Sequence, residues 1–267
     1  KNIKGSKNFT NDESVNDENG HSTVVSGIIH EIAPDAELYF AKVLSNRGSG
    51  SFVGIVNGVK WCKEIGADVI NMSLGGSQPY EPLRLAIEGT LTIAAAGNAG
   101  QSETENTMGY PARFEEVIAI GSINKNLEPS KFSSSGKEGD VMTAGERILS
   151  TYGKNEYVIM SGTSMAAPFV VGMAALKLEG NKDSTDMEWL YELTAKDMLT
   201  EGFDNRSFWG HVTPKFYAQK DTTITDPPVV ENPKVGISFG WEFWAFIGLI
   251  LAVAGGLFFY HRKGKFK

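Results

Sequence analysis

Ser164 is the side chain of this sequence best placed for nucleophilic chemistry. It lies in the run GTSMAAP at 162–168, which opens an apolar segment predicted to be a buried helix through Leu178. A hydroxyl at the start of a helix stands beside N–H groups without intrahelical acceptors, at the positive end of the helix dipole. Those groups would stabilise an oxyanion formed when Ser164 attacks a carbonyl. The same position suits a serine that only caps the helix.

Two further stretches contain residues that could serve such a nucleophile. His21 follows Gly20 and opens an apolar segment that runs to Ile29, and Asn98 lies in a Gly-Asn turn after the small residues 94–96. A serine nucleophile needs a general base and a donor for the oxyanion, and histidine and asparagine can supply these. Taken singly, His21 could be structural and Asn98 could be a turn residue.

In order and spacing, these three motifs resemble the His, Asn and Ser motifs of subtilisin-type serine peptidases. The resemblance implies His21 as general base, Asn98 as oxyanion donor and Ser164 as nucleophile. It covers about residues 8–218, and it implies a three-layer α/β fold with a mostly parallel sheet. The implied activity is that of a serine endopeptidase with polypeptide substrates.

The resemblance also implies a peptide-binding cleft. The edges at Ser49 and Gly75 would pair with substrate backbone by strand addition, and Phe52 and Leu74 would line an apolar pocket. Small residues would leave a roomy apolar pocket, with its bottom at Gly109, for the side chain before the scissile bond (P1). A large apolar or aromatic P1 residue is therefore expected. The implied substrate-binding residues are Gly48, Ser49, Gly50, Phe52, Ser73, Leu74, Gly75, Gly76, Ala94, Ala95, Ala96, Gly97 and Gly109.

The acid of the subtilisin triad has no counterpart in this sequence. In the family it is an aspartate at the end of the first core strand, well before the histidine; we expect an upstream segment to carry both. Asp12 and Asp17 are the aspartates that precede His21, and each is more typical of a solvated loop than of a group orienting the imidazole, so neither is assigned. The alternative is a catalytically dead module that keeps the peptide groove. Ser22 and Val24, where the family has Gly and a second His, also favour that alternative.

The composition limits the remaining function classes. The chain has 267 residues, of which 41% are hydrophobic, enough for one large domain with a substantial core. A net charge of -7 argues against a nucleic-acid partner. The lone cysteine, Cys62, lies in an apolar pattern and is expected to be buried in a helix. His30 and His211 lack neighbours at metal-ligand spacing, so we expect no metal and no cofactor, and no calcium loop between Ile29 and Ala33.

The elements that must position these residues alternate along the chain. The patterns predict helices at 21–29, 52–65, 83–88 and 164–178, and strands at 38–43, 67–72, 91–96 and 117–122. Such alternation is typical of a parallel sheet, whose ligands bind at the carboxyl ends of the strands. Residues 1–20 are predicted to be a surface loop anchored by Phe9, and the first core strand is expected to be missing from this chain.

The last fifty residues predict a membrane anchor. We place the peptidase domain at 1–219, a Pro- and Thr-rich linker at 220–239, a transmembrane helix at 240–260 and a basic tail at 261–267. The basic tail puts the C-terminus in the cytoplasm and the peptidase domain on the outer face of the cell membrane. A wall-sorting signal is the less favoured alternative. Small residues at four-residue spacing could pair two such helices; they are Gly248, Ala252 and Gly256.

Overall fold

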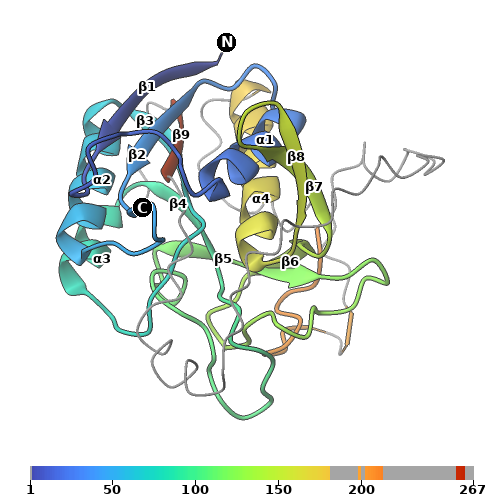
Figure 1. Cartoon of the computed structure of the whole chain (residues 1–267). Coiled ribbons are helices and arrows are strands. Elements are labelled where there is room, and N and C mark those ends of the chain that lie inside the picture. Colours follow the sequence, from blue (N-terminus) through green and yellow to red (C-terminus); the bar gives the residue numbers. More distant parts are fainter. Residues whose placement is uncertain (1, 181–197, 200–201, 213–256, 262–267) are drawn as a thin grey trace.

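A computed structural model of the chain describes residues 2–180, 198–199, 202–212 and 257–261. The strands are β1 (Ile3–Asn8), β2 (Leu38–Lys42), β3 (Ala67–Met72), β4 (Leu91–Ala95), β5 (Val117–Ile123), β6 (Val141–Ala144), β7 (Ile148–Tyr152), β8 (Glu156–Met160) and β9 (Leu257–His261). The helices are α1 (His21–Ile32), α2 (Phe52–Glu64), α3 (Glu81–Ile87) and α4 (Thr163–Gly180). The helices and strands predicted within 21–178 are thus present, with ends that shift by a few residues (Figure 1).

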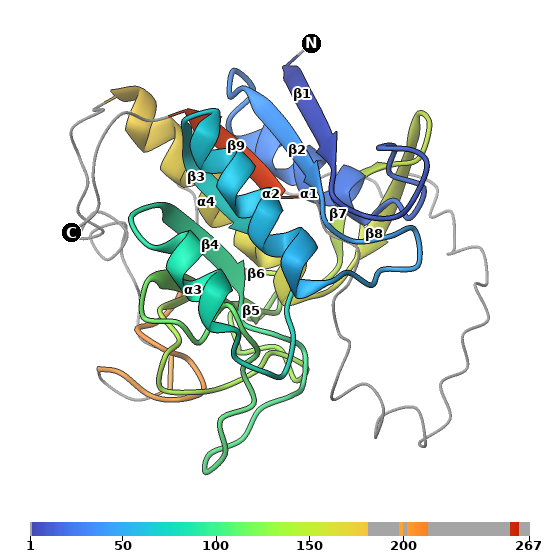
Figure 2. The same cartoon turned by 90° about the vertical axis from the view of Figure 1, so that its left-hand side faces the viewer.

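A seven-stranded sheet in the order β1-β2-β9-β3-β4-β5-β6 forms the middle layer. Every pairing that does not involve β9 is parallel. Figure 2 shows α2 and α3 in front of the sheet and α1 and α4 behind it, while β7 and β8 form a separate antiparallel hairpin that contacts α1. The predicted three-layer α/β fold with a mostly parallel sheet is therefore confirmed.

Two apolar cores, one on each face of the sheet, hold the layers together. On one face, α1 contributes Val24, Val25, Ile28, Ile29 and Ile32, a spacing that keeps them on one side of a helix. Helix α4 lies in the same core and is buried nearly all round, as its continuous apolar sequence predicts. On the other face, α2 and α3 pack over β3 and β4, and Cys62 of α2 is fully buried as predicted.

Helices α1 and α4 approach closely at Gly172. A Cβ atom at Gly172 would lie 2.7 Å from Cβ of Ile32, so only glycine allows this contact. Helix α1 ends just before β2 begins and starts just after the loop that leaves the end of β1. Since β1 and β2 are parallel, the N-terminus of α1 lies at the carboxyl edge of the sheet. The elements thus bring His21 to the edge where ligands bind in folds of this class.

The prediction of a surface loop for residues 1–20 is wrong for its first part. Residues 3–8 form β1, which pairs in parallel with β2 and closes that end of the sheet. Its polar sequence lacks the apolar alternation of a half-buried strand, and its residues are exposed or only partly buried. Phe9 packs against Trp61, with 6.2 Å between ring centroids, as its predicted role as an anchor requires.

The C-terminal prediction needs a correction as well. Residues 257–260 were predicted to end a transmembrane helix, but they belong to β9, which runs antiparallel between β2 and β3. The backbone groups of β3 that face away from β4 find their partners in β9. Residues 220–256 and 262–267, with Gly248, Ala252 and Gly256, lie outside the described residues. Within the part of the chain that is described, no helix is both long and apolar enough to cross a bilayer.

Candidate active site

Ser164 is the second residue of α4 and lies against Ser73, which directly follows β3. Pro168 has no N–H and cannot donate to the carbonyl of Ser164, four residues earlier in the helix. That carbonyl instead accepts a hydrogen bond from the Ser73 hydroxyl at 2.9 Å, and the Ser164 hydroxyl faces the Ser73 carbonyl at 3.5 Å. Because Pro168 lacks an N–H, the hydrogen bond from Ser73 takes its place and joins Ser164 to the carboxyl end of β3.

Asn98 lies just beyond β4, with its side chain held at the head of α4. Its Oδ1 accepts hydrogen bonds from the backbone N–H of Thr163 at 2.9 Å and from the Thr163 hydroxyl at 3.1 Å. The same hydroxyl accepts the N–H of Gly97 at 3.2 Å. With its oxygen engaged in this way, Asn98 has its NH2 group as the end that can donate to a ligand beside Ser164.

His21 is the first residue of α1 and is 2% exposed. Gly20 precedes it with φ 91°, and a Cβ there would lie 2.1 Å from the ring of Tyr152, so glycine alone permits this entry into the helix. The same strand of the hairpin, β7, also holds the first turn of α1, because the Ser150 and Thr151 hydroxyls donate to the carbonyls of Val24 and Thr23.

Asp17 caps helix α1, and the expectation that it is solvated is wrong. Its Oδ1 accepts the N–H of Gly20 at 2.8 Å, and its Oδ2 accepts both the N–H of Thr23 at 2.8 Å and the Thr23 hydroxyl at 2.7 Å. Burial favours the neutral carboxyl, but hydrogen bonds from Ser22, Thr23 and Gly20 outweigh it and hold the pKa of Asp17 below its ordinary value. Sequence position alone could not reveal a cap formed four residues before the helix.

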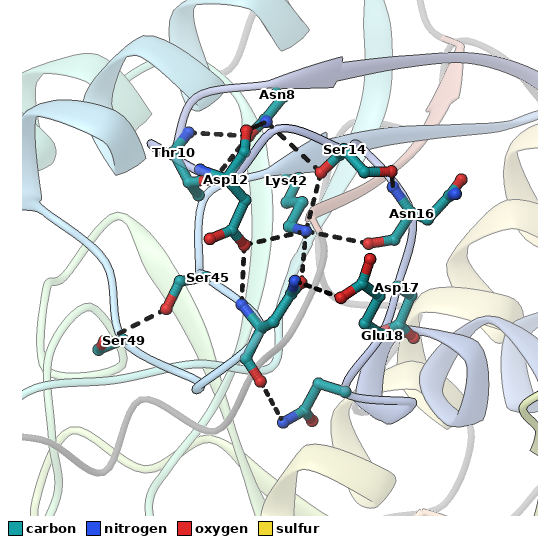
Figure 3. Close-up of polar contacts among 12 residues, drawn as sticks. Asn8, Thr10, Asp12, Ser14, Asn16, Asp17, Glu18, Lys42, Ser45 and Ser49 are labelled. Carbon is teal, nitrogen blue, oxygen red and sulfur yellow. Dashed lines mark hydrogen bonds and ion pairs between the residues drawn. The ribbon is translucent and has the colours of Figure 1, made fainter.

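Asp12 is engaged by Lys42 at the end of β2 (Figure 3). The Lys42 ammonium lies 3.1 Å from Asp12 Oδ2 and donates to the carbonyls of Ser14 and Asn16, each at 2.9 Å. Hydrogen bonding by Lys42 and by the N–H of Asn46 lowers the pKa of Asp12. Both aspartates that precede His21 therefore have structural partners.

A cavity of about 150 Å³ opens beside Ser164 and Asn98. Several of the predicted substrate-binding residues line it, namely Leu74, Gly75, Gly76, Ala95, Gly97 and Gly109. Its remaining lining residues were not predicted, namely Ser77, Ala99, Thr107, Met108, Ser134 and Thr163. None of the lining residues is charged, so the cavity is suited to an uncharged side chain.

Three predicted residues of the cleft lie elsewhere. Ala94 and Ala96 are fully buried in the core under α2 and α3, because alternate residues of a strand face opposite sides of a sheet. Ser73 does not line the cavity but contacts Ser164. The sequence alone therefore indicates that Ala95 faces the opposite side of the sheet from its two neighbours, once β4 is recognised as a strand.

The predicted substrate edge at 48–50 lies in the loop between β2 and α2. The N–H of Ser45 donates to the carbonyl of Ser49 at 2.8 Å, which closes the loop, and Gly50 packs so tightly that a Cβ would lie 2.2 Å from the carbonyl of Val43. Phe52 is 42% exposed and stacks on Tyr80, with 4.8 Å between ring centroids. Tyr80 was not predicted from the sequence. Its position shortly after the predicted substrate-binding stretch 73–76 is the signal that could have indicated it.

Among the described residues, no group of three or more His, Cys, Asp or Glu side chains could hold a metal ion. Burial raises the pKa of the Cys62 thiol well above its ordinary value, which disfavours the reactive thiolate. His211 is 8% exposed and pairs through its backbone with Met142 of β6. Helix α1 continues without interruption through His30 to Ile32.

Comparisons with known proteins identify the family. Residues 1–210 match a family model described as the subtilase family. Subtilisin DY from Bacillus licheniformis is 43% identical over 191 residues, covering 66% of this chain and 70% of that protein. Subtilisin E from Bacillus subtilis (strain 168) is 38% identical over 203 residues, covering 70% of this chain and 53% of that protein.

Solved structures give the same result for the fold. Sphericase superposes with a TM-score of 0.67 at 28% identity, covering 79% of this chain and 84% of that one. A cold adapted subtilisin-like serine proteinase superposes with a TM-score of 0.65 at 30% identity, covering 78% and 82%.

Proposed function

The chain belongs to the subtilase family, and from that premise we propose that it is a serine endopeptidase that cleaves polypeptides through an acyl-enzyme. The Ser164 hydroxyl attacks the scissile carbonyl while His21 takes its proton. Asn98 and the N–H groups at the head of α4 hold the oxyanion. His21 then passes the proton to the leaving amine as the C–N bond breaks, and water hydrolyses the ester. The observation that carries this proposal is the anchoring of the Asn98 oxygen by Thr163, which aims an amide donor beside Ser164.

Covalent labelling tests the nucleophile. A fluorophosphonate should label the full chain, and Ser164→Ala should abolish the label. His21→Ala should slow labelling without removing the hydroxyl. Equal labelling of the wild type and Ser164→Ala would contradict the proposal.

For specificity, we propose a preference for large apolar or aromatic P1 residues. The uncharged cavity beside Ser164 has a volume of about 150 Å³, and an apolar cavity of about that size can hold a benzene ring. A peptide library with varied P1 should favour Phe, Tyr and Leu. A strict preference for Arg or Lys would contradict this part of the proposal.

A second candidate function is a peptide-binding module without turnover. The hydrogen bonds of Asp17 at the start of α1 and the ion pair of Asp12 with Lys42 favour it, because they give both carboxylates a structural role. Binding of a peptide ending in Phe, without hydrolysis and without fluorophosphonate labelling, would select this alternative.

We further propose that the chain is tethered to the outer face of the cell membrane, with its C-terminus in the cytoplasm. The support is the sequence of 243–260, which holds no charge, with Trp241 and Trp244 before its apolar core and four basic residues after it. Because 257–261 form β9, tethering requires these residues to leave the sheet, so the two arrangements exclude each other. Resistance of the full chain to carbonate extraction, with release after truncation at 219, would support tethering; release of both would contradict it.

A further inference from the structure

Ser134 is fully buried and lies against the turn that carries Asn98. Its N–H donates to the carbonyl of Gly97 at 2.9 Å, and its hydroxyl accepts the N–H of Ala99 at 3.1 Å. The two bonds engage the residues immediately before and after Asn98. One buried residue therefore holds both flanks of the proposed oxyanion donor.

Ser134 and Gly97 approach each other closely. Gly97 has φ 116°, and a Cβ placed there would lie 2.9 Å from the Ser134 hydroxyl. Ser134 also lines the cavity beside Ser164. It therefore occupies the wall of the site directly under the turn, where a shift of the turn would move the Asn98 amide.

The segment that contains Ser134 is itself attached to β5 of the sheet. The hydroxyl of the preceding Ser133 accepts the N–H of Ser122 in β5 at 3.1 Å, and Ser130 donates its N–H to the carbonyl of Ser122 at 2.7 Å. Strand β5 pairs with β4 on one side and β6 on the other and is mostly buried, so this attachment is rigid. The following Ser135 binds a different segment, because its hydroxyl donates to the carbonyl of Ser102 at 2.9 Å and accepts the N–H of Ser102 at 2.7 Å.

Two independent supports consequently meet at Asn98. Thr163 holds the side-chain oxygen, and Ser134 holds the backbone on both sides. A donor contributes to catalysis only if it is aimed before the oxyanion forms, because reorientation during the reaction costs part of its effect.

We propose that Ser134 is a positioning residue that fixes the direction of the Asn98 amide for the oxyanion, transmitting the rigidity of β5 to the turn at 97–99. The inference rests on the proposed peptidase function. Its effect belongs to the transition state and not to the bound substrate, since Ser134 acts on the oxyanion donor.

The experiment compares two adjacent buried serines, Ser134 and Ser135, in the full chain. Ser134→Ala should lower kcat about tenfold with KM nearly unchanged, a part of the loss that follows removal of an oxyanion donor. Ser135→Ala is the matched control, because it removes an equally buried hydroxyl whose hydrogen bonds go to Ser102. Rates are expressed per active site, titrated with a fluorophosphonate, so that a smaller folded fraction does not lower the measured kcat.

A second readout separates positioning from a general structural effect. The inhibition constant of a peptide boronate, which forms a tetrahedral adduct with serine, should rise for Ser134→Ala by the factor by which kcat/KM falls. Binding of the matching peptide amide, whose carbonyl stays trigonal, should not change. Ser134→Thr, which keeps the hydroxyl, should recover most of the rate.

Two results would contradict the inference, and they are distinguishable. Equal kcat values for Ser134→Ala and Ser135→Ala, or a loss confined to KM, would overturn the inference while leaving the peptidase intact. A wild-type chain that neither labels nor forms a boronate adduct would overturn the proposed function and the inference together.

Discussion

The hydroxyl of Ser73 donates to the carbonyl of Ser164, the carbonyl that Pro168 leaves without its helical donor. Both partners are buried, so the carbonyl depends on Ser73 for its hydrogen bond. This relationship couples the end of β3 to the proposed nucleophile.

Ser73→Ala should lower the free energy of unfolding by about 1–3 kcal/mol, because it leaves a buried carbonyl unsatisfied. The cost should shrink in a Pro168→Ala background, where the restored N–H can take the Ser164 carbonyl. A double-mutant cycle by urea denaturation measures the coupling. Additive effects of the two substitutions would show that Ser73 does not replace the helical donor.

Thr163→Val should lower kcat about tenfold, because it removes the hydroxyl that binds Asn98 Oδ1 and Gly97 while keeping the side-chain volume. Asn98→Ala should lower kcat about 10²- to 10³-fold, the magnitude measured for subtilisin, a relative of this chain. Since Thr163 acts through Asn98, the double variant should match Asn98→Ala in kcat. A further loss in the double variant would show an independent role for Thr163.

Asp17→Ala should lower the free energy of unfolding by about 1 kcal/mol near neutral pH, as expected for loss of a helix cap. The pKa of Asp17 in the folded state lies below its ordinary value of 3.8, so its contribution is present above that value and is lost as the pH falls through the lower folded pKa. The stability difference between wild type and variant should therefore shrink below about pH 4. Denaturation curves across this range measure it.

Glu13→Ala is the control for Asp17, because Glu13 is an exposed carboxylate of the same loop. It should leave the free energy of unfolding nearly unchanged. A difference between wild type and Asp17→Ala that grows on acidification would contradict the assigned cap.

Lys42→Met should raise KM for an extended peptide several-fold while leaving the reaction of a small ester nearly unchanged. Lys42 ties the 9–19 loop to Asn46, whose side-chain oxygen accepts from its ammonium at 2.6 Å, and Asn46 precedes the proposed substrate edge at 48–50 (Figure 3). Loosening that edge weakens strand pairing with substrate but does not touch Ser164. Kinetics on the two substrates measure the separation.

The matched control is Lys4→Met. Lys4 pairs with Glu37 at 3.1 Å, but both side chains are nearly half exposed, and such pairs contribute little. Parallel losses on both substrates in Lys42→Met would show a general destabilisation and not an effect on the edge.

The sequence by itself determined four helices and four strands between His21 and Leu178, without β6, β7 and β8, and several of the residues around Ser164 and Asn98. Helical periodicity in α1 and the small residues before Asn98 are local signals, and local signals are what a sequence pattern contains. The order of elements then requires their carboxyl edges to meet. The alternation of side chains along a strand also predicts that Ala95 of β4 faces the opposite side of the sheet from Ala94 and Ala96.

Only the tertiary structure decided how the site is held. Ser134, Thr163 and Ser73 each act across a long stretch of chain, and the hydrogen bonds they make leave no periodic mark on the sequence. Pairing is equally non-local for β1 and β9, so neither the polar residues 3–8 nor the apolar residues 257–261 predicted a place in the sheet. The reason is physical: backbone N–H and C=O groups pair regardless of the side chains beside them. Which segment pairs with a given strand therefore depends on the whole fold.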